Sequence, residues 1–152
     1  MFNIPYLYHY VGHSDFSVRQ SRSVAKRFYS TGPTGLPGNS DGGAMQTWLL
    51  WNMIGLYPIT GQTTFLIHSP WFDSMTIDLG DSKQLIILSS GGDGNGDENI
   101  HVQGVTVNGQ PWTKNWLTWD DIFADGGVLE FRLGPTPVQW ATGELPPSPA
   151  SE

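Results

Sequence analysis

The stretch GPTGLPGNSDGGAMQTWLLWNMIGLYP, residues 32–58, joins a glycine- and proline-rich loop to an almost wholly apolar run. One acid, Asp41, stands just before that run. Large apolar residues occur on every side of a helix drawn over residues 44–54, a pattern typical of a helix that other elements cover all round. Gly55 is well placed to end it, because glycine favours the left-handed conformation at a helix C-terminus. A carboxylate at the mouth of a buried helix would need a partner, and none is near it in the sequence.

Upstream of this stretch the sequence predicts two shorter helices. Residues 6–10, YLYHY, form the first, which Gly12 ends, and residues 16–30 form the second, with Ser14 or Asp15 as its N-cap. Two short helices cannot cover a third that is apolar on all sides. The sequence therefore predicts that this chain is part of something larger.

After residue 60 the pattern changes to short strands rich in β-branched and aromatic residues. Five segments fit this description: residues 64–68, 75–79, 84–88, 100–107 and 128–133. Asn108-Gly109 predicts a tight two-residue hairpin. We therefore expect helices over residues 1–59 and a small antiparallel β-sandwich-like segment over residues 60–135. The Pro- and Ser-rich residues 136–152 are expected to be disordered.

The composition excludes several classes of protein. A net charge of −7 argues against nucleic acid as a partner, because a phosphate-binding face needs clustered Lys and Arg. Charged residues make up 14% of the 152 residues, whereas about 25% is typical of soluble domains, which again suggests a covered surface. The chain has no cysteine, no apolar run of the roughly 18 residues that span a bilayer, and no secretion signal at its start.

Asp41 admits two interpretations. An acid shortly before a helix commonly caps it, accepting backbone N–H bonds at the positive end of the helix dipole. The same position suits a general base, because a carboxylate held ionised there can take a proton from water. Gly38, Gly42 and Gly43 have no side chains and would let a bulky ligand approach the backbone.

Other candidate sites have weaker support in the sequence. Residues 93–99, DGNGDEN, imitate a calcium loop, but its sixth and twelfth positions hold Glu98 and Gly104 instead of Gly and Glu, so we interpret the stretch as a mobile acidic turn. His9 and His13 are four residues apart, but no acid is suitably placed to complete a zinc site. The tryptophans of the strand-rich half either belong to its core or interfaces or stack on sugar rings.

Several motifs, in the same order, resemble glycoside hydrolase family 92, the calcium-dependent exo-acting α-mannosidases. Residues 35–59, GLPGNSDGGAMQTWLLWNMIGLYPI, are similar to the family signature. Residues 68–80 and 99–134 resemble its downstream motifs, and residues 4–12, IPYLYHYVG, resemble the segment that follows its NEP motif. The resemblance covers residues 3–135.

The resemblance implies an α+β chain that forms the last helices of an (α/α)6 barrel and the β-rich segment after it. It also implies an inverting reaction on α-linked mannose of N-glycan type. The general base matches Asp41, and Asn39 and Gly38 are the expected substrate-binding positions. Asn39 occupies a position that is an aspartate in some members. Ser40 replaces the first acid of the usual doublet, and Trp119 replaces a common histidine.

The resemblance implies calcium as the cofactor, but its ligands and the general acid belong to upstream segments and match no residue of this chain. The expected partners are an α-mannoside or N-glycan substrate and the missing N-terminal part of the enzyme, or a complementary chain, with neither nucleic acid nor membrane. The isolated chain is expected to be inactive, and the full-length enzyme to be secreted.

Two alternatives remain open at this point. In the first, the β-rich half binds sugars through its tryptophans without catalysis. In the second, the chain is a structural fragment of a truncated paralogue or one half of a split enzyme.

Overall fold

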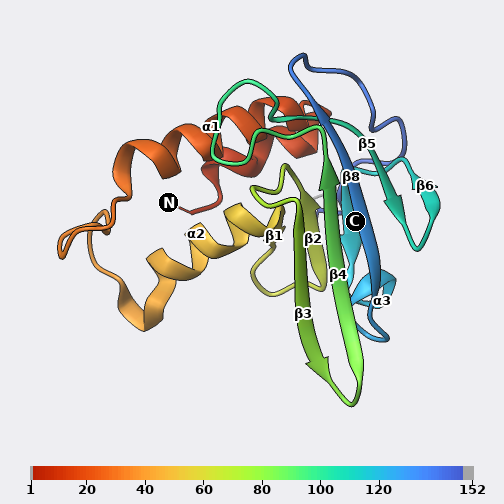
Figure 1. Cartoon of the computed structure of the whole chain (residues 1–152), viewed down its shortest axis with the longest axis horizontal. Coiled ribbons are helices and arrows are strands. Elements are labelled where there is room, and N and C mark those ends of the chain that lie inside the picture. The colour runs from red at the N-terminus through yellow and green to blue at the C-terminus, as the bar shows by residue number, and fades with distance from the viewer. Residues whose placement is uncertain (1, 149–152) are drawn as a thin grey trace.

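A helical layer packs beside a β-rich half in the computed structural model of the chain, which describes residues 2–148 (Figure 1). The helices are η1 (Ile4–Val11), α1 (Ser14–Phe28), η2 (Asp41–Gly43), α2 (Ala44–Ile54) and α3 (Trp119–Ile122). The strands are β1 (Leu56–Pro58), β2 (Thr64–Ile67), β3 (Ser74–Gly80), β4 (Lys83–Ser90), β5 (His101–Val107), β6 (Gln110–Trp112), β7 (Trp116–Thr118) and β8 (Gly127–Gly134). The predicted change from helices to strands near residue 60 is therefore present.

The two upstream helices form where the sequence predicts them, with differences in type and capping. The first is a 3₁₀ helix, and Gly12 ends it in the left-handed conformation, with φ of 75°. The second, α1, has His13 at its N-cap and no side-chain capping bond. The predicted capping by Ser14 or Asp15 is wrong, because both residues lie inside the first turn.

The third helix, α2, has the predicted bounds but is not covered on all sides within this chain. Gly55 ends it with φ of 90°, and a Cβ at this position would lie 2.7 Å from the Pro70 nitrogen, so both conformation and space require glycine. Trp48 and Ile54 are buried, whereas Leu50 is 54% exposed. One apolar face of α2 therefore lies open.

The strands form two sheets, and one of them is not antiparallel. Strands β1, β2 and β7 form a three-stranded antiparallel sheet, and the five-stranded sheet has the order β3-β4-β8-β5-β6. Within the larger sheet β4 and β8 run parallel, with Leu85 opposite Gly127. The prediction of a purely antiparallel segment is corrected to a mixed one.

The helical and β-rich halves share a core. β1 directly follows α2 and pairs with β2, so the smaller sheet joins residues on both sides of residue 59. One buried cluster brings together η1, α1, α2 and this sheet through Tyr6, Ala25, Trp48, Tyr57 and Leu66. A larger cluster lies over the five-stranded sheet and includes Leu85, Leu117 and Leu129, all fully buried.

The segment predicted to be disordered is partly within the described residues. Residues 136–148 contain neither helix nor strand, but they make hydrogen bonds to the β-rich half. The Trp116 indole donates to the Glu144 carbonyl at 3.0 Å, and the Gly143 N–H donates to the Thr113 carbonyl at 2.9 Å. Residues 149–152 lie outside the described residues.

Candidate active site

Asp41 lies at the end of the loop that connects α1 to α2, in the short turn η2 that leads directly into α2. Gly42 and Gly43 follow it with φ of 60° and 75°, a left-handed pair that only glycine adopts without strain. Gly38 is also left-handed, with φ of 97°, and a Cβ there would meet nothing within 4 Å. The three glycines turn the chain sharply on both sides of an exposed carboxylate.

The capping interpretation of Asp41 is not confirmed. The N-cap of α2 is Gly43, and the Asp41 contribution to this turn is its backbone carbonyl, which accepts the Ala44 N–H. Among residues 2–148 the Asp41 carboxylate has no hydrogen-bond or ion-pair partner. Its oxygens are therefore free to accept a proton from water or to meet a ligand.

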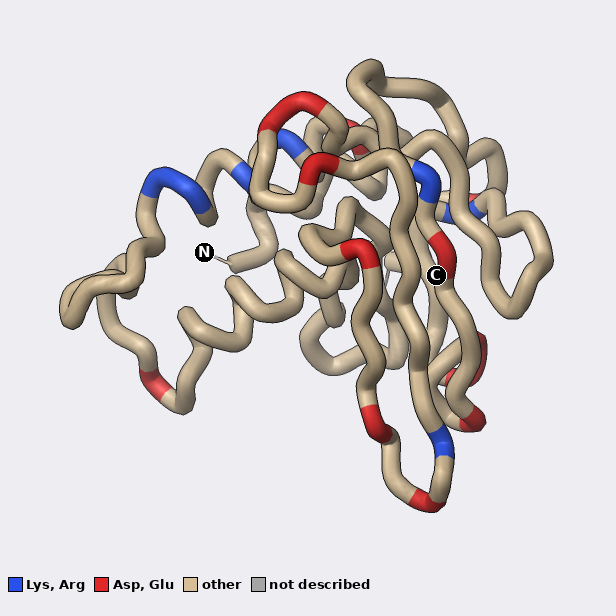
Figure 2. Tube along the Cα trace, viewed as in Figure 1, with Lys and Arg blue, Asp and Glu red and all other residues tan. Residues whose placement is uncertain are grey.

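The residues around Asp41 are held by one polar contact. The Ser40 hydroxyl donates to the Gln46 side-chain carbonyl, which ties the loop to the first turn of α2. Asn39 is exposed beside them. Gly38, Asn39 and Asp41 lie on one loop, and Figure 2 shows one acidic position at this end of the molecule, within the described residues.

The described residues do not offer a calcium site. Within residues 2–148 no three His, Cys, Asp or Glu side chains lie close enough together to hold a metal ion. The calcium that the family resemblance implies therefore has no fitting ligand set among them.

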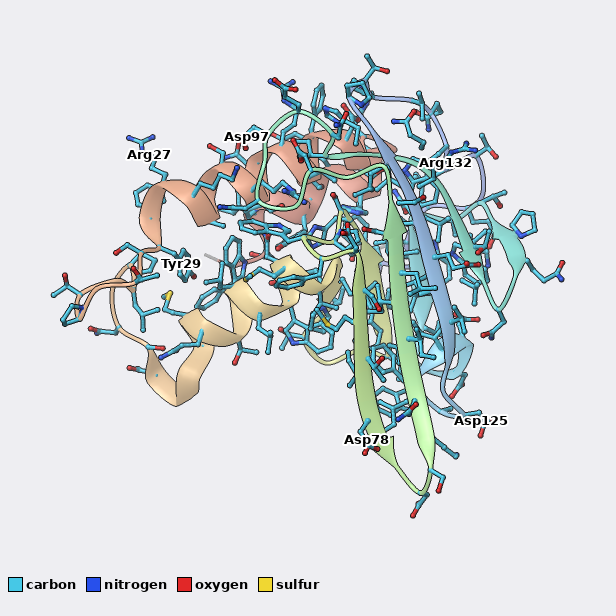
Figure 3. All side chains as sticks on the ribbon, in the orientation of Figure 1. Arg27, Tyr29, Asp78, Asp97, Asp125 and Arg132 are labelled. Carbon is cyan, nitrogen blue, oxygen red and sulfur yellow. The ribbon has the colours of Figure 1, made fainter. Side chains whose placement is uncertain are left out.

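The acidic turn at residues 93–97 is held in place by the helix beside it. The Asp93 carboxylate accepts the backbone N–H groups of Glu98 at 2.8 Å and Asn99 at 3.2 Å. Lys26 of α1 pairs with Asp97 at 2.6 Å and also donates to the Asn95 carbonyl. Figure 3 shows Asp97 beside α1. The segment is an acidic turn as predicted, whereas its mobility stays a prediction; its carbonyl oxygens accept hydrogen bonds from cationic side chains of α1.

The histidine pair is not a metal site. His9 is fully buried. Its Nε2 donates a hydrogen bond to the Ile67 carbonyl at 2.7 Å, and its Nδ1 accepts one from the Ser17 hydroxyl at 2.8 Å. His13 is exposed at the start of α1. Burial lowers the pKa of His9 from 6.5 to about 4, so its ring is neutral at physiological pH.

Most of the tryptophans that might stack on sugars have other neighbours. Trp71 lies under the Arg22 guanidinium, 4.9 Å from the ring centroid. Lys114 lies over Trp116 at 4.7 Å and over Trp112 at 6.0 Å. Trp119 differs, because it is 47% exposed and stacks on Phe123 at 5.1 Å.

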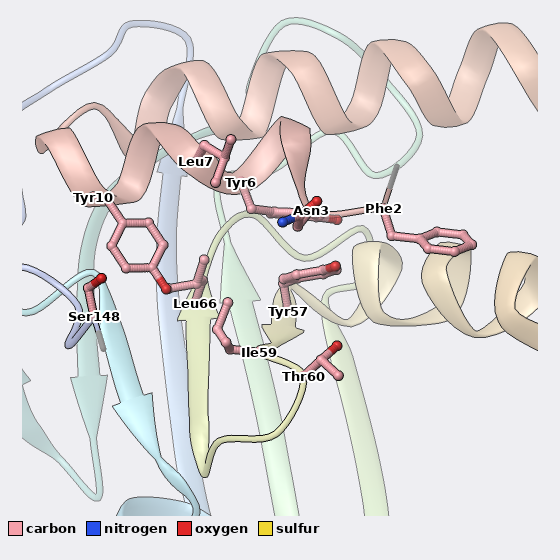
Figure 4. Close-up of a pocket in the computed structure, with 10 residues that line it drawn as sticks. All are labelled: Phe2, Asn3, Tyr6, Leu7, Tyr10, Tyr57, Ile59, Thr60, Leu66 and Ser148. Atoms are coloured by element: carbon pink, nitrogen blue, oxygen red, sulfur yellow. The ribbon is translucent and has the colours of Figure 1, made fainter. Parts of the chain in front are cut away.

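A cavity of about 730 Å³, which the sequence did not predict, lies between η1 and the β1–β2 edge. Figure 4 shows its lining, in which tyrosines from η1 and β1 are prominent. The closely spaced tyrosines at positions 6 and 10 are the sequence signal that could have pointed to it, since both line the cavity.

Comparison with known proteins places the chain in a class. Residues 1–135 match the family model described as the glycosyl hydrolase family 92 catalytic domain. An uncharacterized secreted glycosidase from Arthroderma benhamiae is 32% identical over 145 residues, which are 94% of this chain and 19% of that protein.

Solved structures agree with this match. The GH92 alpha-mannosidase BT3965 from Bacteroides thetaiotaomicron, solved with mannoimidazole, superposes with a TM-score of 0.87 and 29% identity, over 97% of this chain and 20% of that one. The GH92 inverting mannosidase BT2199 from the same organism superposes with a TM-score of 0.79 and 28% identity, over 90% of this chain and 18% of that one. The GH92 hydrolase ccman5 superposes with a TM-score of 0.89 over 99% of this chain and 24% of that one. Its sequence identity is 24%, so this match supports the fold alone.

The mixed α+β fold and these matches define a glycoside hydrolase catalytic region with mannosidases as structural neighbours. More narrowly, the chain belongs to glycosyl hydrolase family 92. It spans about a fifth of the length of the relatives it matches. Within residues 2–148, no helix has the length and apolar character needed to cross a membrane.

Proposed function

We propose that the chain supplies the C-terminal part of an inverting exo-α-mannosidase that trims α-linked mannose from N-glycan-type substrates, with Asp41 as general base. The observation that carries this proposal is an exposed carboxylate, unpartnered within residues 2–148, on a glycine-turned loop of a family 92 chain. A base must have free oxygens to accept a proton from the attacking water. Gly38 and Asn39, which lie just before Asp41 on the same loop, are the proposed substrate contacts.

Inversion needs a second carboxyl group that this loop does not provide. In inverting glycosidases the acid and the base are about 6.5–9.5 Å apart, which leaves room for the attacking water. We infer that the acid, and calcium with its ligands, come from the four-fifths of the relatives' length that this chain does not span. The isolated chain is accordingly expected to be inactive.

The helical half offers a surface for that missing part. Twelve large apolar side chains are exposed among residues 2–148, and eight of them precede residue 55. Val11 is 64% exposed, Leu50 54% and Phe28 51%. Interfaces bury apolar side chains, so an interface with the missing part would account for this concentration in one half of the chain. We infer that further helices of an (α/α)6 barrel cover it, in the same polypeptide or in a complementary chain, and that the full-length enzyme is secreted.

The test uses a chimera in which residues 1–135 replace the matching fifth of BT3965. We expect it to release mannose from an α-mannoside, and Asp41→Asn to lower kcat by about 10²–10⁴-fold without changing the melting temperature. Asp73→Asn, at another exposed acid, is the matched control and should leave kcat unchanged. Near-normal turnover of the Asp41→Asn chimera would refute the assignment.

A second candidate function is glycan binding without catalysis. Trp119 supports it, because one ring face packs on Phe123 while the side chain remains about half exposed. Rigid exposed aromatic rings are common contacts for sugars. Two results together would favour this function over the first. Trp119→Ala would abolish mannobiose binding by the chimera, and Asp41→Asn would leave its turnover unchanged.

A further inference from the structure

The loop that carries Asp41 gains little rigidity from packing. Residues 30–43, the Asp41 loop, connect α1 to α2. A Cβ at Gly38, Gly42 or Gly43 would meet nothing within 4 Å, so the backbone on both sides of the carboxylate has open space around it. A misplacement of about 1 Å can cost a catalytic group about a hundredfold in rate. Contacts to the two helices therefore have to hold a base on this loop in place.

Tyr29 joins the two ends of the Asp41 loop. It directly follows α1, and its hydroxyl donates to the Met45 carbonyl in the first turn of α2 at 3.1 Å. Its ring stacks on Trp48, with centroids 5.7 Å apart and planes at 13°, and Figure 3 labels Tyr29 between the two helices. Burial raises the pKa of Tyr29, so the phenol keeps its proton and remains a donor at neutral pH. One side chain thus fixes where the loop begins relative to where it ends.

A second contact lies next to the carboxylate. The Ser40 hydroxyl donates to the side-chain carbonyl of Gln46, which lies in the same turn of α2 as Met45. Within residues 2–148 this is the only side-chain hydrogen bond that a residue of the Asp41 loop makes. The Ser40 carbonyl also accepts the Gly43 N–H at 3.0 Å. Because Ser40 directly precedes Asp41, these bonds limit where the carboxylate can lie.

We propose that Tyr29, Ser40 and Gln46 are positioning residues that preorganise the Asp41 carboxylate for the attack of water. This inference rests on the proposed function of Asp41, and none of the three residues touches the reacting atoms in it. A base that is already held in place needs no reorganisation during the reaction. Loss of one restraint therefore lowers kcat and leaves substrate affinity unchanged.

The first test measures the loop in the chain itself and does not depend on the role of Asp41. Relaxation NMR of the folded chain gives the order parameters of the backbone amides. We expect about 0.85 at residues 39–41, as in a rigid backbone, and less than about 0.6 in Tyr29→Phe or Ser40→Ala. Ser40→Thr keeps the hydroxyl and should keep the loop rigid. Values already below about 0.6 in the unaltered chain, or no change in either variant, overturn the proposal.

The second test measures turnover in the BT3965 chimera. Tyr29→Phe, Ser40→Ala and Gln46→Ala should each lower kcat about three- to tenfold, the usual effect of one hydrogen bond, with KM unchanged. Ser40→Ala and Gln46→Ala remove the same bond, so the double variant should be no slower than either single variant. Ser40→Thr should restore kcat. Ser74→Ala, at an exposed position in β3, is the matched control and should leave kcat unchanged.

Asp41→Asn in the same chimera separates the two proposals. Normal turnover in this variant would overturn the proposed function and the positioning role together. Loss of turnover in Asp41→Asn, beside normal kcat in Tyr29→Phe and Ser40→Ala, would overturn the positioning role alone. A rise in KM at constant kcat would also overturn it, because the residues would then contribute to substrate binding.

Discussion

His9 and His68 are both fully buried in the core that joins the helices to the smaller sheet. His68 lies against Tyr6, with ring centroids 5.3 Å apart. Burial lowers the pKa of His68 well below 6.5, and electrostatic coupling to His9 and to the Arg22 cation lowers it further. The folded state therefore requires both rings to be neutral, and this requirement makes its stability depend on pH.

The free energy of unfolding is expected to fall as the pH falls from 6.5 toward 4. In this window the unfolded state binds protons at both histidines, whereas the folded state, with the pKa of His9 lowered to about 4, does not. The contribution is fully present above pH 6.5, and its loss from His9 alone is on the order of 3 kcal/mol. Urea denaturation at a series of pH values measures it.

The control for this prediction is His13→Asn, which changes an exposed histidine and should retain the same pH dependence. A stability that stays constant between pH 6.5 and 4.5 would contradict the neutral-core account.

Among the elements, α1 is joined to the β-rich half by Arg22, which is 2% exposed. Its guanidinium donates to the Pro70 carbonyl at 2.9 Å and to the Gly94 carbonyl at 3.0 Å, so it connects two loops to the helix. Burial lowers the pKa of Arg22 to about 10, and the nearby negative charges of Asp93 and Asp97 oppose this shift in part. Arg22 therefore remains a cation at neutral pH. Figure 2 shows this basic helix facing the acidic loop.

Arg22→Met is expected to lower the free energy of unfolding by about 3 kcal/mol, because it leaves buried carbonyls unpaired while keeping similar bulk. Arg22→Lys should recover only part of the loss, since one ammonium cannot reach both loops. Arg27→Met, an exposed position on the same helix, should change stability by less than about 0.5 kcal/mol. Equal effects of Arg22→Met and Arg27→Met in chemical denaturation would show that this joint is unimportant.

Elements with strong local signals were predictable from the sequence. The Asn108-Gly109 hairpin forms as predicted, with φ of 50° and 76°, because both residues favour the left-handed conformation that the turn needs. The five predicted strands are all present. Strands β1 and β7, of three residues each, are too short to show a periodicity, and the parallel pairing of β4 with β8 depends on distant residues.

The site was predictable only in part, for a similar reason. The glycines and Asp41 lie in one continuous loop, so the sequence alone brings them together. The anchoring of the acidic turn by Arg22 and Lys26 joins residues about 70 positions apart, and local patterns carry no information on such contacts. The proposed role of Asp41 as a base comes from the resemblance to the family, since no local pattern specifies it.

At the scale of the whole molecule, the exposed apolar side chains of the helical half are the residues that the proposed missing part of the enzyme would cover. Leu50→Glu should change the stability of the isolated chain by less than about 0.5 kcal/mol, since this side chain is 54% exposed. In the BT3965 chimera the same change should lower the melting temperature and turnover, because it places a charge in a buried interface.

Phe72→Glu is the matched control for this interface. Phe72 is 43% exposed and belongs to the β-rich half, within the residues that the chimera carries. Thermal melts give the melting temperature of each variant in the isolated chain and in the chimera. Equal losses of melting temperature by the two variants in the chimera would contradict the proposed interface.

The most direct test of the central claim is an α-mannoside-release assay of the chain alone and of the chimera, with calcium and with a chelator. The account predicts a folded, monomeric chain without turnover beside a chimera that turns over only when calcium is present. Calcium-dependent turnover by the chain alone would contradict it, because an acid within these 152 residues would then have to replace the missing one.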